Sequence, residues 1–140
     1  MAGIGKTTLV KAVAKEALHE KLFCDAVEVT VSQSPNLVKI QKEIAERLDL
    51  VFHKDGFKEK ALELRDRLKK EEKFLIILDD VWKKLDLLDI GIAFEDHQKG
   101  CKILLTSRSQ DVLRNEMGVK GDLFIAYLHI VFVMRHISQH

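Results

Sequence analysis

Apolar residues along the chain switch between a helical and a strand-like spacing. Between residues 7 and 22 they recur every three or four positions, which predicts a helix, whereas residues 26–31 alternate with polar ones and predict a strand. A second helix is expected to begin at Ser34, with Pro35 in its first turn, and a third is expected over residues 57–72. The apolar stripes of these two helices should be buried: Leu37, Ile40, Ile44, Leu48, Ala61, Leu64 and Leu68.

Short, almost wholly apolar runs mark further strands. Residues 74–78 (FLIIL) and 102–106 (KILLT) predict strands that are covered on both faces, as in a parallel sheet. A short helix or turn is expected over 83–91, a helix over 109–117 and a last strand over 123–128. Strands that alternate with helices predict a three-layer α/β domain, with a parallel sheet between helices and right-handed crossovers.

Composition narrows the class of protein. The chain has 140 residues and is 46% hydrophobic, which predicts one globular domain. Its net charge of +1 indicates no general affinity for nucleic acid or anionic membranes. We find no secretory signal and no run near the ~20 apolar residues that cross a bilayer, which favours a soluble cytosolic protein without a membrane span. Cys24 and Cys101 adjoin apolar segments, and both are expected to be buried, reduced thiols.

The stretch GIGKTT (3–8) fits the end of the phosphate-binding loop G-x-x-x-x-G-K-[ST]. In such a loop the glycines let backbone N–H groups approach phosphate oxygens. Lys6 would reach the β- and γ-phosphates, the Thr7 hydroxyl would ligate Mg²⁺, and Thr8 would contact the α-phosphate side. Only two residues precede Gly3, so we expect the first loop glycine and the strand that leads into the loop to be lacking.

Polar residues directly follow the two apolar strands. Asp79 and Asp80 come after FLIIL, and Thr106, Ser107 and Arg108 end or follow KILLT. Ligands of open α/β sheets bind at the carboxyl ends of strands, so these groups should share one edge with the loop. We expect Asp79 to complete the Mg²⁺ site and Asp80 to orient or deprotonate an attacking water. Arg108 would sense the γ-phosphate.

Three motifs together are similar to one known family. IGKTTL (4–9), FLIILDDVW (74–82) and GCKILLTSR (100–108) resemble the NB-ARC nucleotide-binding domain of plant intracellular immune receptors. Trp82 resembles the receptors whose N-terminal domain is a coiled coil rather than a TIR domain. The resemblance implies a switch that holds ADP at rest, exchanges it for ATP on activation, hydrolyses ATP slowly at most, and acts in defence signalling.

The resemblance covers residues 1–128 and leaves the tail 129–140 unassigned. It implies a P-loop NTPase fold lacking its first, central strand, which would lie between 74–78 and 102–106. Both of those strands would then lack a neighbour, so we expect the chain to aggregate or melt non-cooperatively, to bind ADP weakly and to have little or no ATPase activity.

By position, the resemblance implies a set of nucleotide-binding residues: Gly3, Ile4, Gly5, Lys6, Thr7, Thr8 and Arg108. It implies Thr7 and Asp79 as the Mg²⁺ ligands and Asp80 as the catalytic carboxylate. The implied partners are ADP or ATP and the other parts of a receptor, namely its coiled coil and leucine-rich repeats, or a full-length receptor.

Two alternatives stay open. The chain could be another P-loop ATPase or a small-molecule kinase, although residues 109–122 offer only Arg114 for an arginine-rich lid. It could also be a non-catalytic fragment that acts only by protein interaction.

The chain departs from the family pattern in a further respect, since no GLPL or MHD motif follows the strands.

Overall fold

The computed structural model describes residues 19–20, 24–92, 101–117, 124–126 and 129–134. Within them one sheet has the strand order β1-β2-β3-β5-β4. Its strands are β1 (Asp25–Thr30), β2 (Phe74–Asp79), β3 (Cys101–Ser107), β4 (Phe124–Ala126) and β5 (His129–Met134). The helices are α2 (Leu37–Arg47), α3 (Phe57–Lys69), α4 (Leu87–Ile90) and a π-helical turn η1 (Val112–Glu116). The helix expected over 7–22 lies largely outside the described residues.

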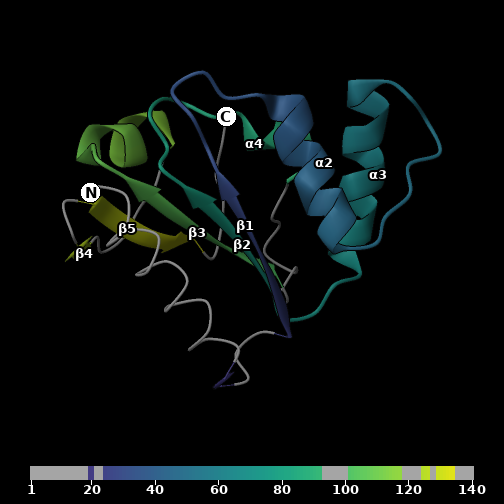
Figure 1. Cartoon of the computed structure of the whole chain (residues 1–140), viewed down its shortest axis with the longest axis horizontal. Coiled ribbons are helices and arrows are strands. Elements are labelled where there is room, and N and C mark those ends of the chain that lie inside the picture. The colour runs from purple at the N-terminus through teal and green to yellow at the C-terminus, as the bar shows by residue number, and fades with distance from the viewer. Residues whose placement is uncertain (1–18, 21–23, 93–100, 118–123, 127–128, 135–140) are drawn as a thin grey trace.

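The first three strands form the parallel sheet that the alternating pattern predicts (Figure 1). β1 pairs with β2, and β2 pairs with β3, with Phe74 opposite both Asp25 and Cys101. All six residues of β2 are buried, so both faces of this central strand are covered. The α/β fold class is confirmed.

The expected gap between the two apolar strands does not exist. β2 and β3 are direct neighbours, from Phe74 opposite Cys101 to Leu78 opposite Leu105, so the expectation that a missing strand separates them is wrong. Direct pairing gives both strands a continuous hydrogen-bonded ladder and leaves no unpaired row of backbone groups between them. The premise of an empty central slot, from which we expected poor folding, is therefore not met.

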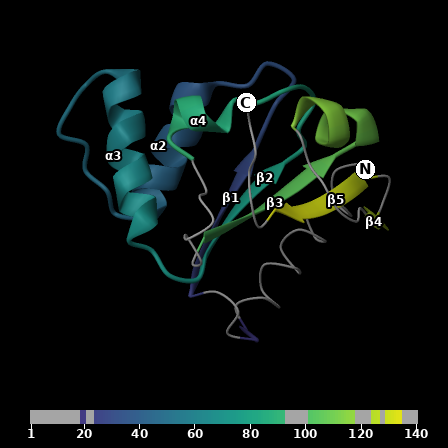
Figure 2. The same cartoon turned by 180° about the vertical axis from the view of Figure 1, so that it is seen from behind.

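The other edge of β3 is occupied by the C-terminal strand. β5 pairs antiparallel with β3, from Ile103 opposite Met134 to Ser107 opposite Ile130, and β4 pairs antiparallel with β5. The strand expected over 123–128 therefore exists as β4 but is not the last one. Both strands lie at the end of the sheet away from α2 and α3 in either view (Figures 1 and 2), which makes the sheet mixed.

The helices α2, α3 and α4 pack together on one side of the sheet (Figures 1 and 2). Their predicted stripes are buried, apart from the half-buried Leu37. The same core includes alternate residues of the strands: Val27, Val29, Phe74, Ile76, Leu78, Cys101, Ile103 and Leu105. Since successive strand residues point to opposite faces, Asp79 and Thr106 belong to the face away from this core.

Two details of this helical layer were not predicted. The N-cap of α2 is Asn36 instead of Ser34, because the Asn36 side chain accepts a hydrogen bond from Lys39 N at 3.1 Å. The buried Gln41 side chain donates to Phe57 O at 3.2 Å and to Ile90 O at 3.0 Å, which ties α2 to the ends of α3 and α4. A polar group can be buried here because both of these bonds compensate it.

The two cysteines differ. Cys101 is buried, its Sγ donates to Leu68 O at 3.4 Å, and burial together with the nearby Glu71 raises its pKa to about 12. Cys101 is therefore a buried free thiol, as predicted, and its raised pKa disfavours the reactive thiolate. Cys24 is exposed, so the expectation of burial is wrong for this residue. The reason is that Cys24 precedes β1, whose buried residues lie further along the strand.

Across the residues described above, none of the helices has the length and apolar character that spanning a membrane requires.

Candidate functional site

The carboxyl ends of β2 and β3 bring three of the predicted site residues together. β2 ends at Asp79, with Asp80 next, and β3 ends at Ser107, with Arg108 next. Because the two strands are parallel neighbours in register, these ends meet at one edge of the sheet. The other predicted site residues lie outside the described part of the chain: Gly3, Ile4, Gly5, Lys6, Thr7 and Thr8.

Asp79 is held by the neighbouring strand. Its side chain is nearly inaccessible, at 3% exposure, and its Oδ1 accepts a short hydrogen bond from the Thr106 hydroxyl. Thr106 is itself 1% exposed and continues the β2–β3 register on the same face as Asp79. A carboxylate bonded in this way keeps one orientation, which is the property that a metal ligand needs.

Asp80 turns the chain out of the sheet. Its φ of 68° lies in the left-handed region, which aspartate tolerates better than most residues. The Asp80 N–H donates to Thr106 Oγ1 at 2.9 Å, so one threonine hydroxyl fixes both aspartates. Unusual backbone conformations that the surroundings hold in place are concentrated at functional sites.

The segment after β2 is fastened to the end of β3. Val81 N donates to Thr106 O at 2.8 Å, and the Ser107 hydroxyl donates to Val81 O at 2.6 Å. Ser107 Oγ also accepts from Ser109 N at 3.1 Å, which fixes the turn that carries Arg108. Strand pairing and these bonds together make the edge rigid.

Arg108 extends from this edge toward Asp80 and Trp82. Its Nε lies 4.0 Å from Asp80 Oδ1, and its guanidinium carbon lies 5.4 Å from the centre of the Trp82 ring. The Arg108 side chain is 52% exposed, so an anion at this edge could reach it. The arrangement combines carboxylate oxygens, which can ligate a metal, with a guanidinium, which can bind a phosphate.

Thr106 and Ser107 belong to the candidate site, although the sequence predicted no role for them. The Thr106 hydroxyl bonds directly to the Asp79 carboxylate and to the Asp80 N–H, and the Ser107 hydroxyl donates to Val81 O. The available signal was their place directly before Arg108, at the end of a buried strand. Their roles depend on which strand lies beside β3, and this pairing is not visible in local sequence.

Magnesium fits these residues. Carboxylate and hydroxyl oxygens are its preferred protein ligands, and it is usually held by one or two carboxylates plus substrate phosphates. Among the residues that the structure describes, no three His, Cys, Asp or Glu side chains gather into a complete cage. The Asp79 carboxylate is an oxygen ligand of the kind that such a Mg²⁺ site uses.

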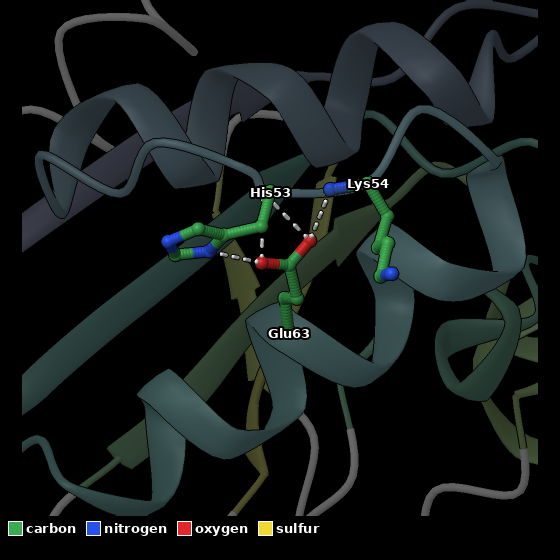
Figure 3. Close-up of polar contacts among 3 residues, drawn as sticks. All are labelled: His53, Lys54 and Glu63. Atoms are coloured by element: carbon green, nitrogen blue, oxygen red, sulfur yellow. Dashed lines mark hydrogen bonds and ion pairs between the residues drawn. The ribbon is translucent and has the colours of Figure 1, made fainter.

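A second polar cluster lies between α2 and α3 and has a structural role. The Glu63 carboxylate accepts from His53 N at 2.9 and 3.1 Å, from Lys54 N at 3.2 Å and from His53 Nδ1 at 2.8 Å (Figure 3). The backbone N–H of His53, followed by its ring N–H, holds the pKa of Glu63 below its ordinary value of 4.5. Glu63 thus fastens the loop that connects the two helices.

The parallel strands, the helical layer and the acidic carboxyl edge define an α/β domain with a candidate binding site at the strand ends. Comparison with known proteins gives the family: the NB-ARC domain model matches residues 1–128. The chain belongs to the NB-ARC family of nucleotide-binding domains.

Several curated plant proteins are similar over most of this chain. Disease resistance protein At4g27190 of Arabidopsis thaliana is 42% identical over 127 residues, which cover 88% of this chain and 13% of that protein. Disease resistance protein SUMM2 of the same plant is 39% identical over 117 residues, or 80% of this chain and 13% of that protein. Disease resistance protein RPS5 is 33% identical over 132 residues, covering 91% and 15%. The chain thus spans about one seventh of the length of these relatives.

Proposed function

We propose that this chain is the nucleotide-binding switch of a plant disease-resistance protein, which holds ADP at rest and ATP when active. Family membership and the similarity to disease resistance proteins support this proposal. The switch would act in the cytoplasm, in defence signalling, together with the other parts of such a receptor. We further propose residues 1–128 as the NB-ARC unit and leave the tail 129–140, which supplies β5 of the same sheet, unassigned.

The observation that carries the proposal is the polar network at the carboxyl edge. Asp79 and Asp80 are both bonded to the Thr106 hydroxyl, and Arg108 lies beside Asp80. We place the phosphates at this edge in our proposal, because strand ends and a glycine-rich loop would offer N–H donors there.

Each residue then has a distinct role. Lys6 would bind the β- and γ-phosphates, and Gly3, Ile4, Gly5 and Thr8 would supply backbone or hydroxyl donors around them. Arg108 would contact the γ-phosphate of ATP. Asp80 would orient an attacking water or accept its proton, which makes the chain at most a slow ATPase.

Thr7 and Asp79 would hold Mg²⁺ next to the phosphates. A bound Mg²⁺ would offset the negative charge of the phosphate oxygens. The Thr106 hydroxyl fixes the Asp79 carboxylate before any ligand arrives, so little ordering is left for the binding step.

Calorimetric titration with ADP and Mg²⁺ tests the proposal. Lys6→Ala should remove most of the affinity of the parent chain, because it deletes the cation aimed at the β-phosphate. Lys11→Ala is the matched control, since it removes a lysine from outside the GIGKTT motif and should leave affinity within about twofold. Equal ADP affinity in the parent and Lys6→Ala would refute the site.

The two aspartates can be separated in the same way. Asp79→Asn should weaken binding only when Mg²⁺ is present, whereas Asp80→Asn should leave binding intact and slow any hydrolysis. If both variants lose binding equally and hydrolysis is unchanged, the separate roles are wrong.

The alternatives are less well supported. Membership of the NB-ARC family disfavours a small-molecule kinase. A fragment that acts only by protein interaction would show no heat of ADP binding in the parent chain, so the same titration distinguishes it.

A further inference from the structure

Trp82 and Arg108 form a cation–π pair at the carboxyl edge. Arg108 Cζ lies 5.4 Å from the centre of the indole ring, within the ~6 Å over which such pairs attract. Trp82 is 38% exposed and does not belong to the buried core cluster. Its contact with Arg108 therefore needs an explanation other than core packing.

The backbone fixes where the two side chains meet. Val81, directly before Trp82, is bonded through its N–H to Thr106 O at 2.8 Å and through its carbonyl to the Ser107 hydroxyl at 2.6 Å. Ser107 directly precedes Arg108. Both members of the pair thus start from backbone positions that are tied to each other across two strands.

The Trp82 ring restricts the Arg108 side chain and leaves the guanidinium N–H donors available for an anion. An exposed arginine loses much conformational freedom when it orders on a ligand. A guanidinium placed over an aromatic ring is already ordered, and its N–H donors remain suited to phosphate oxygens. Asp80 Oδ1, 4.0 Å from Arg108 Nε, restricts the same side chain from another direction.

We infer that Trp82 is a positioning residue, which holds Arg108 at the carboxyl edge. In this position Arg108 raises the affinity of the site for a nucleoside triphosphate and leaves its affinity for a diphosphate unchanged. The inference rests on the proposed function and deepens it, because it assigns to one residue the discrimination between the two nucleotides. A diphosphate has no γ-phosphate for Arg108 to contact, so it should not depend on the pair.

A double-mutant cycle tests the inference in the full 140-residue chain. Trp82→Leu removes the π face and keeps apolar bulk, Trp82→Phe keeps an aromatic face, and Arg108→Ala removes the cation. Affinities for ADP and for a non-hydrolysable ATP analogue would be measured by calorimetry with Mg²⁺ present. Thermal melting of each variant checks that it folds.

Trp82→Leu should weaken the ATP analogue roughly 3–10-fold and ADP less than about twofold, whereas Trp82→Phe should stay within about twofold of the parent chain for both. In the Arg108→Ala background, Trp82→Leu should have no further effect on the ATP analogue. A merely structural role of Trp82 would instead weaken both nucleotides, with or without Arg108.

Fluorescence gives a second readout that needs no nucleotide. Trp82 is the single tryptophan of the chain, so the emission of the whole protein reports on its surroundings. Arg108→Ala should change this emission, and unchanged emission would overturn the inference.

The two proposals fail in distinguishable ways. If the parent chain binds both nucleotides but Trp82→Leu weakens them equally, or acts equally without Arg108, only the inference is overturned. If the parent chain binds neither nucleotide, the proposed function fails and the inference falls with it.

Discussion

Replacing Thr106 by valine is the sharpest test of the network at the carboxyl edge. Valine has nearly the same shape, so Thr106→Val removes the hydroxyl without opening a cavity. The change deletes the donor to Asp79 Oδ1 and the acceptor of the Asp80 N–H in one step. Both bonds lie in a part of the protein with little access to water, since Thr106 is 1% and Asp79 is 3% exposed.

The cost follows from these two bonds. A hydrogen bond to a charged group contributes about 1.5–3 kcal/mol, and a neutral one contributes about 0.5–1.5 kcal/mol. We therefore expect Thr106→Val to lower the free energy of unfolding by roughly 2–4 kcal/mol. In a domain of this size that corresponds to a fall of roughly 6–12 °C in melting temperature.

The assay is thermal unfolding followed by far-ultraviolet circular dichroism, with Thr106→Ser as the matched control. Serine keeps the hydroxyl and loses one methyl group, so it should melt clearly above the valine variant. Two results would show that the hydroxyl does not hold the two aspartates. In the first, Thr106→Val melts within about 1–2 °C of the parent chain. In the second, Thr106→Ser melts at a lower temperature than Thr106→Val.

Three further predictions concern the rest of the fold. Gly91→Ala should lower the free energy of unfolding, measured in urea, by roughly 2–4 kcal/mol, because Gly91 has a φ of 112° and a Cβ there would overlap Ala61 O. Gly56→Ala, at a φ of −73°, should lower it by under about 1 kcal/mol, and equal losses in the two variants would refute the reasoning. Glu63→Gln should lower the melting temperature at pH 7, because the loop bonds stabilise the ionised form. Since the pKa of Glu63 is lowered in the folded chain, this stabilisation is present above the ordinary value of 4.5 and is lost as pH falls through the folded pKa. A difference in melting temperature between the parent chain and Glu63→Gln that stays constant down to pH 3 would contradict this sign. Ending the chain after Leu128 removes β5 and exposes the edge of β3, which should cost roughly 3–5 kcal/mol or cause aggregation in light scattering; an unchanged, monomeric chain would contradict the pairing.

The elements of the fold could be predicted because each has its own periodicity. The all-apolar run FLIIL became the fully buried β2, and the stripe of Ile40 and Ile44 faces the core as expected. Periodicity does not reveal which strands become neighbours, because pairing depends on long-range packing. For that reason the β2–β3 contact and the β5–β3 pairing were not predicted.

The candidate site could be predicted in part. The meeting of Asp79, Asp80 and Arg108 could be predicted because parallel strands end at one edge, so the residues that follow them converge. Thr106 was given no role, since its hydroxyl matters only through partners 26 and 27 positions away in the sequence. The pairing of Trp82 with Arg108 was hidden for the same reason.

The most direct test of the central claim, that nucleotide binds at the carboxyl edge of β2 and β3, is an NMR titration of the ¹⁵N-labelled chain with ADP and Mg²⁺. The account predicts saturable shifts of the Asp80, Thr106 and Arg108 amides and of the single Trp82 indole N–H, together with the amides of GIGKTT. The His53 amide, which is fastened to Glu63, should stay unchanged and serves as the internal reference. Saturable binding that leaves the edge resonances in place, or that shifts the loop around His53 instead, would contradict the account.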